Sequence, residues 1–570
     1  IMTDRPGLKP GDTVEVRRAG SGEALLRYVV VTTPEIEPAL IPSISSAARR
    51  TSVDGEILAK LEDISDSGLR GWAVDPLDRG RVFDIEVLID EHFFCFTRND
   101  SPRADLVNHK VSAGLGGVRV ALPLGRLEAG KHVVSLRLPD GKILSKTATV
   151  GASSLPYRLS EGVLPIAPRD VAVIVPVYNA VDDVETCIER LARFTPPEVE
   201  VVFIDDASPD PAMAGLMCRA AARPGMRGLT NARNLGFTRT INRGLEEVGR
   251  KHAILLNSDA RVTPGWVEGM LVAAASRPRV ATVTAMSDRA GAFSAPELGN
   301  ANTLPPGVDE ITYARAFRRR SLGLYPVVPT GNGFCMFVNR ACIDEIGALD
   351  ADAFPRGYGE ENDFCMRAGR AGWTNLIDDR TYVFHDRSKS FGDAKTELMA
   401  AGRAVVDARY PEYSKAIRVF TTGADLNLAR FRARLAMADC ASARTGLPAV
   451  LFVVATQTGG TPQTNLDLMT ALADGLDSWL LRCDSRELTL SRLDGTHLRE
   501  VRRHRLAEPV DPIRHHSGEY DAVVRDWIRE IGPEIVHIRH LGWHSLSLPS
   551  IAKEQGAAVV FSFHDFYTLC

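Results

Sequence analysis

A polar triplet at the end of an apolar run is the clearest candidate for chemistry in this sequence. Residues 253–256 are apolar, and Asn257, Ser258 and Asp259 follow them directly. A step of this kind predicts that Asp259 lies at the tip of a buried strand. Carboxylate oxygens suit Mg²⁺ or Mn²⁺, and such an ion needs few protein ligands when a substrate diphosphate supplies others. The same residue types also form turns and N-caps, so the triplet alone leaves both interpretations open.

Two earlier apolar runs also end in groups that could bind a nucleotide. The first closes on Tyr178 and Asn179, which offer ring stacking and hydrogen bonding to a base. The second closes on Asp205 and Asp206, and a carboxylate there can accept a hydrogen bond from the imide nitrogen of uracil or thymine. Ordinary strand-end and Asx turns explain each segment equally well when it is taken alone. The combination with the triplet favours a nucleotide site.

Three acids follow a glycine-flanked loop. Glu360, Glu361 and Asp363 come directly after Gly357-Tyr358-Gly359, where we expect a helix to begin. A sugar hydroxyl is a poor nucleophile, so its reaction needs a base within hydrogen-bond reach, and a carboxylate beside another acid can have a raised pKa. Acids also complement the dipole at a helix N-terminus, which accounts for Glu360 or Asp363 without a catalytic role.

A histidine ends a further strand candidate at residues 382–385. His385 could complete a metal site with Asp259, while Lys389 and Ser390 could contact phosphate. A single histidine after a strand is more often only hydrogen bonded, so this residue too gains weight from its neighbours.

Composition excludes several other classes of protein. A chain of 570 residues is expected to form three or four domains. Its 45% hydrophobic and 25% charged content is that of globular protein. The net charge of -4, with only short basic runs such as residues 318–320, makes nucleic acid an unsuitable partner.

Cysteine usage and hydropathy bear on location. The nine cysteines are scattered without a C-x-x-C pair, which indicates a reducing compartment rather than a disulfide framework or a zinc knuckle. No apolar run approaches the roughly 20 residues of a membrane span, and no signal peptide opens the chain. We therefore expect a cytoplasmic protein that can still associate with the inner face of the cell membrane. Ile1 before Met2, and an end at Cys570 just after a strand candidate, suggest a piece of something longer.

The hydrophobic pattern predicts a multidomain protein. Short alternating runs between turns predict a small N-terminal β-sandwich, and continuous Val and Ile runs alternating with helical stretches predict a central α/β, Rossmann-like domain. A helical connector leads to a second α/β start, and no internal repeat stands out. The predicted units are a leader (1–51), the β-sandwich accessory domain (52–152), the central domain (169–395), the connector (396–446) and a partial Rossmann-like domain (447–570).

Several individual elements are predicted with bounds. In the central domain we expect parallel strands at 171–177, 199–204 and 253–256 and an amphipathic helix at 181–194. In the last unit we expect strands at 449–455, 534–538 and 557–563.

The order and spacing of the central segments resemble the family 2 glycosyltransferases, which have the GT-A fold. The resemblance covers about residues 169–395 and rests on five segments: Pro176–Asn179, Asp205–Ser208, Asn234–Phe237, Leu256–Trp266 and Gly357–Arg367. It implies that Asp205 contacts the nucleobase, that Asp259 ends the metal motif, and that Glu361 occupies the catalytic-base position. The strict motif has Asp where this chain has Asn257, and a Glu stands where Asp is common, so the choice between Glu361 and Glu360 stays open.

The resemblance also implies a full set of site residues. The donor-binding candidates are Pro176, Tyr178, Asn179, Asp205, Asn234, Gly236, Asn257, Ser258, Gly333 and Lys389, and the metal candidates are Asp259 and His385.

The implied reaction is an inverting, metal-dependent sugar transfer. A hexosyl or deoxyhexosyl group would pass from a nucleoside-diphosphate sugar to a glycan or lipid-linked glycan hydroxyl, with Mn²⁺ or Mg²⁺, in bacterial surface polysaccharide synthesis. Glu361 would deprotonate the hydroxyl in a single displacement. The alternative is a carbohydrate-binding or scaffold protein with a degenerate GT-A domain. A nucleotidyltransferase usually needs a basic glycine-rich phosphate loop near the first strand, and this sequence has no such loop there.

Both flanking units have weaker resemblances. From Leu447 the chain resembles the first half of a family 4-like GT-B glycosyltransferase, with a strand and glycine-rich loop through Thr461 and strand-end motifs at 535–542 and 563–567. The second half-domain of that fold would follow Cys570, so we expect this piece to be catalytically silent as it stands. The β-sandwich resembles accessory domains of bacterial polysaccharide enzymes, and spacing or protein contact is favoured over carbohydrate binding.

Overall fold

The computed structural model divides the chain into two compact units, Ile1–Ser43 and Ile44–Cys570. It describes residues 13–17, 24–29, 56–65, 68–127, 130–150, 166–299, 302–385, 394–440, 447–455, 460–511, 513–555 and 557–562. In the first unit β1 (Thr13–Arg17) pairs antiparallel with β2 (Ala24–Val29). We expected a loosely ordered leader there, and the Thr-Val-Glu-Val-Arg alternation of β1 was too short to predict a strand.

The second unit begins with two four-stranded antiparallel sheets, in the orders β10-β9-β5-β6 and β3-β4-β8-β7. Leu69 and Val118 of one sheet share a hydrophobic core with Val87 and Leu136 of the other. The strands are β3 (Leu58–Ser65), β4 (Gly68–Val74), β5 (Asp84–Ile89), β6 (His92–Arg98), β7 (Ser101–Pro102), β8 (Leu115–Val120), β9 (Gly130–Arg137) and β10 (Ile143–Val150), with the short helix α1 (Ala104–Asn108) between β7 and β8.

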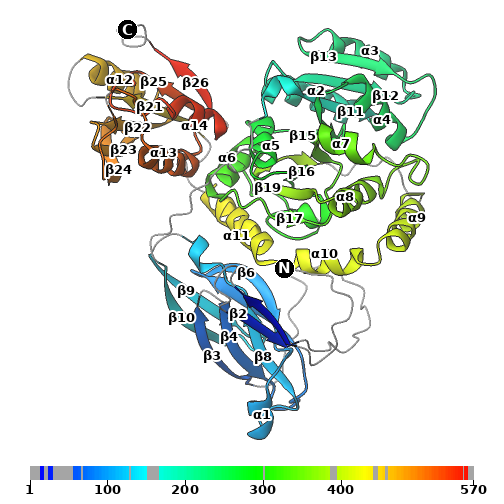
Figure 1. Ribbon diagram of the computed structural model, residues 1–570, viewed down its shortest axis with the longest axis vertical. Helices are drawn as coiled ribbons and strands as arrows, with labels where there is room; N and C mark the ends of the chain where they lie inside the picture. The colour runs from blue at the N-terminus through cyan, green and yellow to red at the C-terminus, as the bar shows by residue number, and fades with distance from the viewer. Residues whose placement is uncertain are drawn as a thin grey trace. The chain divides into compact units, whose positions relative to one another are not determined.

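An eight-stranded mixed sheet forms the centre of the second unit, in the order β13-β12-β11-β14-β18-β16-β19-β17 (Figure 1). Strand β11 is parallel to β12 and β14, whereas β18 runs antiparallel to β14 and β16. The strands are β11 (Val171–Val177), β12 (Glu200–Asp205), β13 (Met226–Thr230), β14 (His252–Leu256), β16 (Val280–Met286), β17 (Val327–Val328), β18 (Cys335–Val338) and β19 (Thr374–Tyr382). A separate antiparallel pair joins β15 (Ala260–Arg261) to β20 (Phe384–His385).

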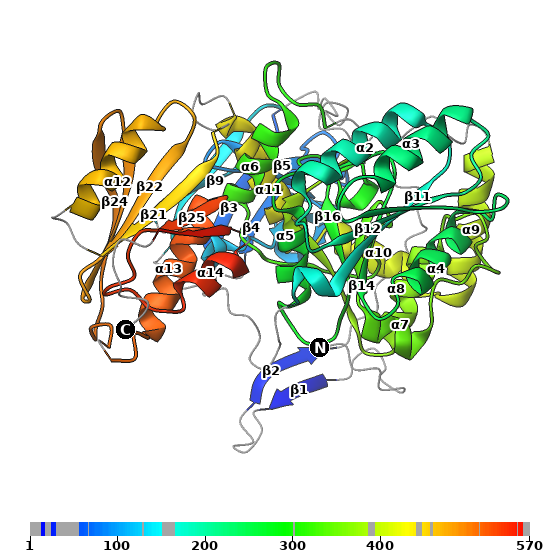
Figure 2. The same ribbon diagram turned by 90° about the horizontal axis from the view of Figure 1, so that it is seen from above.

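The central sheet is buried on both faces, as its continuous apolar runs predict. Alternate residues of β11 enter different cores: Val173 and Val175 lie in one, and Ala172 and Ile174 lie in the other. Figure 2 shows α2 and α3 on one side of β11 and β12, with α4, α7 and α8 on the other side. These helices are α2 (Val181–Phe194), α3 (Pro211–Ala221), α4 (Phe237–Glu247), α7 (Arg340–Ile346) and α8 (Glu360–Arg370); α5 (Trp266–Ala274) and α6 (Glu310–Arg320) pack in the first core.

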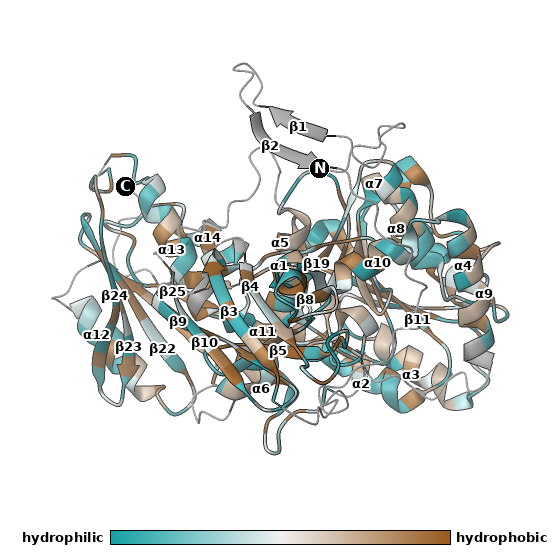
Figure 3. Ribbon diagram, turned by 90° about the horizontal axis from the view of Figure 1, so that it is seen from below, coloured by the Kyte–Doolittle hydropathy of each residue, from teal (hydrophilic) through white to brown (hydrophobic). Residues whose placement is uncertain are grey.

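Helix α2 shows why these segments fold as helices. Its buried residues Val184, Cys187, Ile188 and Leu191 recur at the spacing of one helical face. The exposed positions of α4 carry hydrophilic residues, including Arg239, Glu246 and Glu247 (Figure 3). The predicted bounds of this helix, 181–194, agree with the structure.

Three helices follow the central sheet, and a six-stranded sheet follows them. The helices are α9 (Ala394–Arg409), α10 (Tyr413–Thr421) and α11 (Ala424–Asp439). The sheet has the order β24-β23-β22-β21-β25-β26. Its elements are β21 (Ala449–Val454), α12 (Gly460–Ala471), β22 (Asp477–Cys483), β23 (Glu487–Asp494), β24 (His497–Arg505), α13 (Gly518–Ile531), β25 (Ile535–Ile538), α14 (Leu548–Glu554) and β26 (Ala558–Phe561).

The three strands predicted for this last sheet are present, and β22, β23 and β24 extend it beyond the prediction. Residues 456–459 and 563–567, which carry most of the glycine loop and the last strand-end motif, lie outside the described residues. Within the described part of the chain, no helix combines the length and apolar character needed to cross a membrane.

Helix α4 packs so closely on the central sheet that Gly244 cannot carry a side chain without displacing its neighbours. A Cβ atom there would overlap the Ile174 side chain and lie 3.1 Å from Cδ1 of Ile204. We predict that Gly244→Ala lowers the free energy of unfolding by about 1–3 kcal/mol through overpacking, although alanine favours a helix. The urea midpoint measures the change. Gly215→Ala in α3 is the control, because its Cβ would meet only the tip of Arg219 at 3.7 Å; equal losses in both variants would contradict the packing argument.

Candidate functional site

The carboxyl ends of β11, β12 and β14 meet at one edge of the sheet because these strands are parallel neighbours. The backbone N–H of Asn179 donates to Oγ of Ser208 at 2.9 Å. The N–H of Ser208 in turn donates to Oδ1 of Asp205 at 3.0 Å. The structure therefore brings together the first two predicted nucleotide-binding segments.

The turn after β11 presents unused polar groups. Asn179 has a φ of 57°, in the left-handed region that asparagine tolerates better than most residues. Its Oδ1 atom is buried and has no hydrogen-bond partner among the described residues. Tyr178 is 37% exposed, so its ring is accessible, whereas Pro176 is a partly buried residue inside β11. A buried amide oxygen of this kind is costly unless something donates to it.

Asp206 has a structural role that sequence analysis did not separate from that of Asp205. Its Oδ1 accepts from Nδ2 of Asn231 at 2.6 Å and from the N–H of Leu235 at 2.7 Å. Its Oδ2 accepts from the N–H of Gly236 at 2.9 Å. These three bonds hold the turn before α4.

The two glycines among the predicted donor-binding residues differ in what they permit. Gly236 has a φ of 86°, and a Cβ atom there would overlap the carbonyl oxygen of Pro355, so the fold itself requires glycine. Asn234 is exposed, and its Oδ1 accepts from the N–H of Gly236 at 3.1 Å. At Gly333, by contrast, a Cβ atom would meet no described atom within 4 Å. The space beside Gly333 is therefore open to a ligand.

Asp259 and His385 face each other across the β15–β20 pair, in which Ala260 lies opposite His385. Oδ1 of Asp259 is 3.2 Å from Nε2 of His385, and Nδ2 of Asn257 is 3.3 Å from the same nitrogen. Nδ1 of His385 lies 3.2 Å from the carbonyl oxygen of Arg289 and donates to it. A carbonyl oxygen can only accept, so Nδ1 carries a proton and Nε2 is the nitrogen that faces Asp259. Two such ligands suit a divalent ion whose other ligands come from a diphosphate and water.

Asp288 is a residue of this site that sequence analysis missed. Its Oδ1 accepts from the backbone N–H of His385 at 2.9 Å and from Oγ of Ser287 at 3.1 Å. Burial raises the pKa of Asp288. The ring of Phe334 stacks on His385 with a centroid distance of 5.1 Å. A signal was available, because β16 is another apolar run that ends in a Ser-Asp pair.

Glu360 and Glu361 begin α8 as expected, directly after Gly359. Glu360 is 4% exposed, and its Oε2 accepts from the N–H of Gly359 at 3.0 Å. Burial, and then the charge of Glu361, raise the pKa of Glu360 well above its usual value; burial also raises the pKa of Glu361. The two neighbouring carboxyl groups are buried together, so ionising both at once is unfavourable. Glu361 is only partly buried as a residue, and its Oε2 has no hydrogen-bond partner in the described part of the chain.

The turn before β18 links the acidic pair to the histidine. The N–H of Gly331 donates to Sγ of Cys365, one turn along α8 from Glu361, at 3.1 Å. The carbonyl oxygen of Phe334 accepts from the N–H of Asn257 at 2.8 Å. Both halves of the predicted site therefore rest on the same short turn.

The structure says less about three other residues from the sequence analysis, Lys389, Ser390 and Ser258. Lys389 and Ser390 lie outside the described residues. Ser258 is partly buried between Asn257 and Asp259. Across the described ranges, no group of three or more His, Cys, Asp and Glu side chains converges to hold a metal ion. The predicted metal candidates Asp259 and His385 form a facing pair.

Residues 172–347 match the family model described as Glycosyl transferase family 2. The N-acetylglucosaminyl-diphospho-decaprenol L-rhamnosyltransferase of Mycobacterium tuberculosis (strain ATCC 25618 / H37Rv) is 27% identical over 256 residues, which cover 41% of this chain and 81% of that protein. The solved structure of GalNAc-T7 with UDP, GalNAc and Mn²⁺ has a TM-score of 0.33 and 14% identity, over 46% of this chain and 56% of that chain. The mannosyltransferase PcManGT from Pyrobaculum calidifontis, in complex with GDP-Man and Mn²⁺, has a TM-score of 0.33 and 17% identity, over 55% and 83%.

The central segment is thus a family 2 glycosyltransferase domain, set in a chain of several α/β and β sheets. The chain is a glycosyltransferase.

The three bonds to Asp206 predict that this residue stabilises the fold. Asp206→Asn places an NH₂ group against backbone N–H donors, so we expect the free energy of unfolding to fall by about 1–3 kcal/mol. Chemical denaturation checks this value. Asp210→Asn is the matched control, because Asp210 caps α3 by accepting from the N–H of Ala212 at 2.9 Å and asparagine caps equally well. A loss in the control as large as that in Asp206→Asn would refute the assignment.

Proposed function

We propose that this chain is an inverting, metal-dependent glycosyltransferase. It moves a sugar from a nucleoside-diphosphate sugar to the hydroxyl of a glycan or lipid-linked glycan, in bacterial surface polysaccharide synthesis, with a GT-A domain at residues 169–395. The observation that carries the proposal is the acidic pair at the start of α8, in which Glu360 is deeply buried while Glu361 keeps an oxygen without a hydrogen-bond partner among the described residues. A lipid-linked acceptor is supported by the similarity to the N-acetylglucosaminyl-diphospho-decaprenol L-rhamnosyltransferase of Mycobacterium tuberculosis.

The donor nucleotide binds at the shared edge of β11, β12 and β14. Tyr178 stacks on the base, the buried Oδ1 of Asn179 accepts a hydrogen bond from it, and Asp205 accepts from the imide nitrogen of a uracil or thymine. Backbone at Gly333 lies beside the sugar, since the space there is open.

Asp259 and His385 would hold a Mn²⁺ or Mg²⁺ ion. Their facing oxygen and nitrogen, the proton fixed on Nδ1 of His385 and the partial burial of both side chains fit such an ion. When bound, the ion offsets negative charge on the departing diphosphate.

Glu361 acts as the general base. It takes the proton of the acceptor hydroxyl, whose oxygen then attacks the anomeric carbon from the side opposite the diphosphate, with inversion and without a covalent intermediate. Glu360 keeps its proton in this reaction, because burial and then the charge of Glu361 raise its pKa well above the usual value. Glu360 is too deeply buried to reach a substrate itself.

The flanking units support rather than perform this reaction. Residues 447–570 resemble the first half of a GT-B fold, and the proposed transfer uses none of their side chains. Residues 52–152 form a β-sandwich that serves for spacing or protein contact, because Leu428 and Phe431 of α11 complete its core. The chain associates peripherally with the inner face of the cell membrane in this proposal, because a lipid-linked acceptor would be available there.

A donor panel tests the proposal. Uridine, thymidine and guanosine diphosphate sugars are titrated by calorimetry with and without Mn²⁺ or Mg²⁺, and turnover is then measured with the donor that binds. We expect Asp259→Ala to lose metal-dependent binding. We expect Glu361→Gln to bind normally and to lose about 10²–10⁴-fold in kcat.

Glu360→Gln is the matched control for Glu361→Gln. Because Glu360 is already protonated, the neutral amide preserves its charge and its donor group, so kcat should fall by far less. If Glu360→Gln is as inactive as Glu361→Gln, the roles are assigned wrongly. If no sugar nucleotide binds with any metal, the carbohydrate-binding or scaffold alternative replaces the proposal.

The raised pKa of Glu361 predicts the pH dependence of kcat. A general base must be deprotonated, so activity falls as the pH drops through the pKa of Glu361 in the enzyme–substrate complex. Burial raises that pKa, so the acid limb should lie above the value near 4.3 of an ordinary glutamate. A pH–rate profile from pH 4 to 9 measures it. An acid limb at or below the ordinary value would argue against Glu361 as the base.

A further inference from the structure

Helices α9 and α10, residues 394–421, lie beyond the segment 172–347 that matches the family model. Figure 1 shows α9 next to α8, the helix that begins with the acidic pair. We propose that these two helices, called the arm below, are a working part of the transfer site. In this inference, which rests on the proposed function, Gly402, Arg409 and Tyr410 are positioning residues for Glu361.

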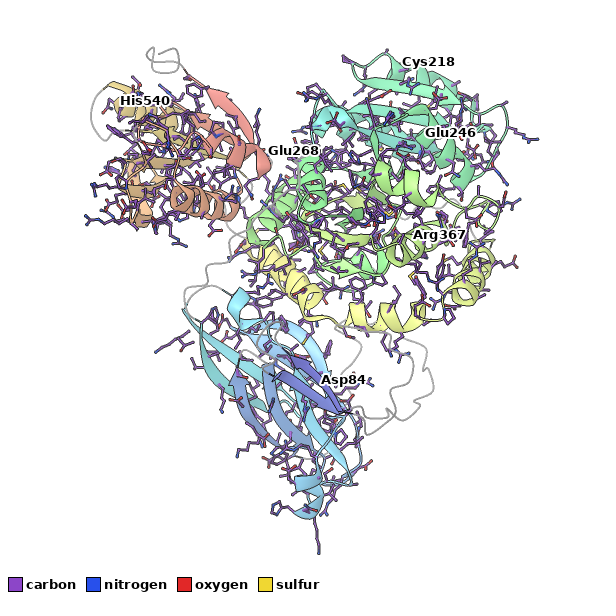
Figure 4. The ribbon with its side chains drawn as sticks, viewed as in Figure 1. Asp84, Cys218, Glu246, Glu268, Arg367 and His540 are labelled. Atoms are coloured by element: carbon purple, nitrogen blue, oxygen red, sulfur yellow. The ribbon has the colours of Figure 1, made fainter. Side chains whose placement is uncertain are left out.

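The arm holds α8 through Asp363, the third acid of the predicted cluster. The side chain of Asp363 is fully buried, and its Oδ1 accepts from Nη1 of Arg409 and from the hydroxyl of Tyr410, both at 2.8 Å. Its Oδ2 accepts from Nε of Arg367, labelled on α8 in Figure 4, at 2.8 Å. Asp363 lies in the same helical turn as Glu361. A buried charge needs all its partners, so losing those on the arm releases this turn.

Arg409 ties the same turn to a second loop. Its Nη1 also donates to Oδ2 of Asp350 at 2.9 Å, so one nitrogen bridges two carboxylates. Beneath this polar contact lies an apolar layer shared by α8, its preceding loop and the arm. That layer consists of Phe354, Met366, Val406, Tyr410 and Tyr413.

The arm also supports the loop directly before the acidic pair. Gly357, Tyr358 and Gly359 have φ values of 91°, 69° and 141°, a succession that only glycine adopts easily. Gly402 of α9 packs so tightly on this loop that a Cβ atom there would collide with the carbonyl oxygen of Tyr358. The backbone of α9 thus braces the loop at its one non-glycine residue.

A third contact comes from α10, which packs against β17, the strand that ends shortly before Gly331. Tyr413 of α10 is buried in the apolar layer with Phe354 and Met366. The arm therefore contacts the helix that carries the acidic pair, the loop before it and the strand that leads to the turn beside it.

These contacts decide where the base stands. The opposite face of α8 is fixed in the core by Phe364, Cys365 and Ala368, but its first turn and the preceding loop depend on the arm. A general base displaced by about 1 Å loses on the order of 10²-fold in rate. The donor segments at the ends of β11 and β12 lie on other elements, so donor binding should not depend on the arm.

The first test uses two helix glycines of the full chain. Gly402→Ala should lower kcat by about 10–100-fold while the Kd for the donor changes less than about twofold, because the collision moves the Tyr358 loop. Gly369→Ala is the matched control, since Gly369 lies in α8 and its Cβ would meet no described atom within 4 Å. It should leave both quantities unchanged. Equal kcat in the two variants overturns the inference.

The second test uses the bridging cation. Arg409→Ala should lower kcat at least tenfold with donor affinity retained, and Tyr410→Phe, which removes only a hydroxyl, should lower it less. Arg409→Lys should recover most of the loss, because an ammonium group can also donate to Asp350 and Asp363 at once. If Arg409 had only a structural role, Arg409→Ala would lower thermal stability and donor binding together, and Arg409→Lys would not restore kcat alone.

Hydrogen exchange separates failure of this inference from failure of the proposed function. Amides of residues 357–363 should exchange faster in Gly402→Ala and Arg409→Ala than in Gly369→Ala, whether or not turnover is measured. Unchanged exchange overturns the arm's role even if the enzyme is active. If the two variants exchange faster but the wild-type chain binds no sugar nucleotide, the contact between the arm and α8 stands and the proposed function fails. The assignment of Glu361 as the positioned group then fails with it.

Discussion

The parallel pairing of β11 with β12 and β14 is the constraint on which the site depends. Parallel strands end at the same edge of a sheet, so residues more than 70 positions apart, such as Tyr178 and Asn257, meet there without any direct contact to guide them. The alternation of β11 between two cores fixes this register, because a slip of one residue would exchange the cores entered by Val173 and Ile174. Apolar burial thus positions polar groups that contribute little to stability themselves.

Antiparallel strands bring site residues from later in the chain to the same edge of the sheet. Strand β18 runs back beside β14 and delivers the turn with Gly331 and Phe334, and β20 pairs with β15 to set His385 beside Asp259. The acidic pair differs, because it stands at a helix start whose loop has three residues with positive φ. Burial there raises the pKa of both acids, and the charge of Glu361 raises that of Glu360 further, because two charges side by side are costly in such a place.

Local pattern predicted the elements whose signal is local. The bounds of α2 and β11 follow from their hydrophobic patterns. The strand-end triplet and His385 stood out because each ends an apolar run, and Glu361 stood out because it belongs to an acidic cluster after a glycine-flanked loop. Contacts between distant residues were out of reach. Arg409 and Tyr410 lie 46 and 47 residues from Asp363, and nothing in the helical pattern of α9 marks them as its partners. Sequence also could not separate Gly236, which the fold requires, from Gly333, which leaves open space.

Helix α11 shows why a helix predicted only as a connector can do more. Leu428 and Phe431 lie in the core of the two N-terminal sheets, where the ring of Phe431 packs edge-on against Phe94 at 5.7 Å. Ala429 and Ala433 lie in a core of the central sheet. A helix that is apolar on opposite faces lacks a single hydrophobic stripe, which is the pattern of a helix buried between two layers. Residues shared by two cores resist separation of both, and this argues that the N-terminal sheets act by contact with the transferase unit rather than as a freely tethered binding module.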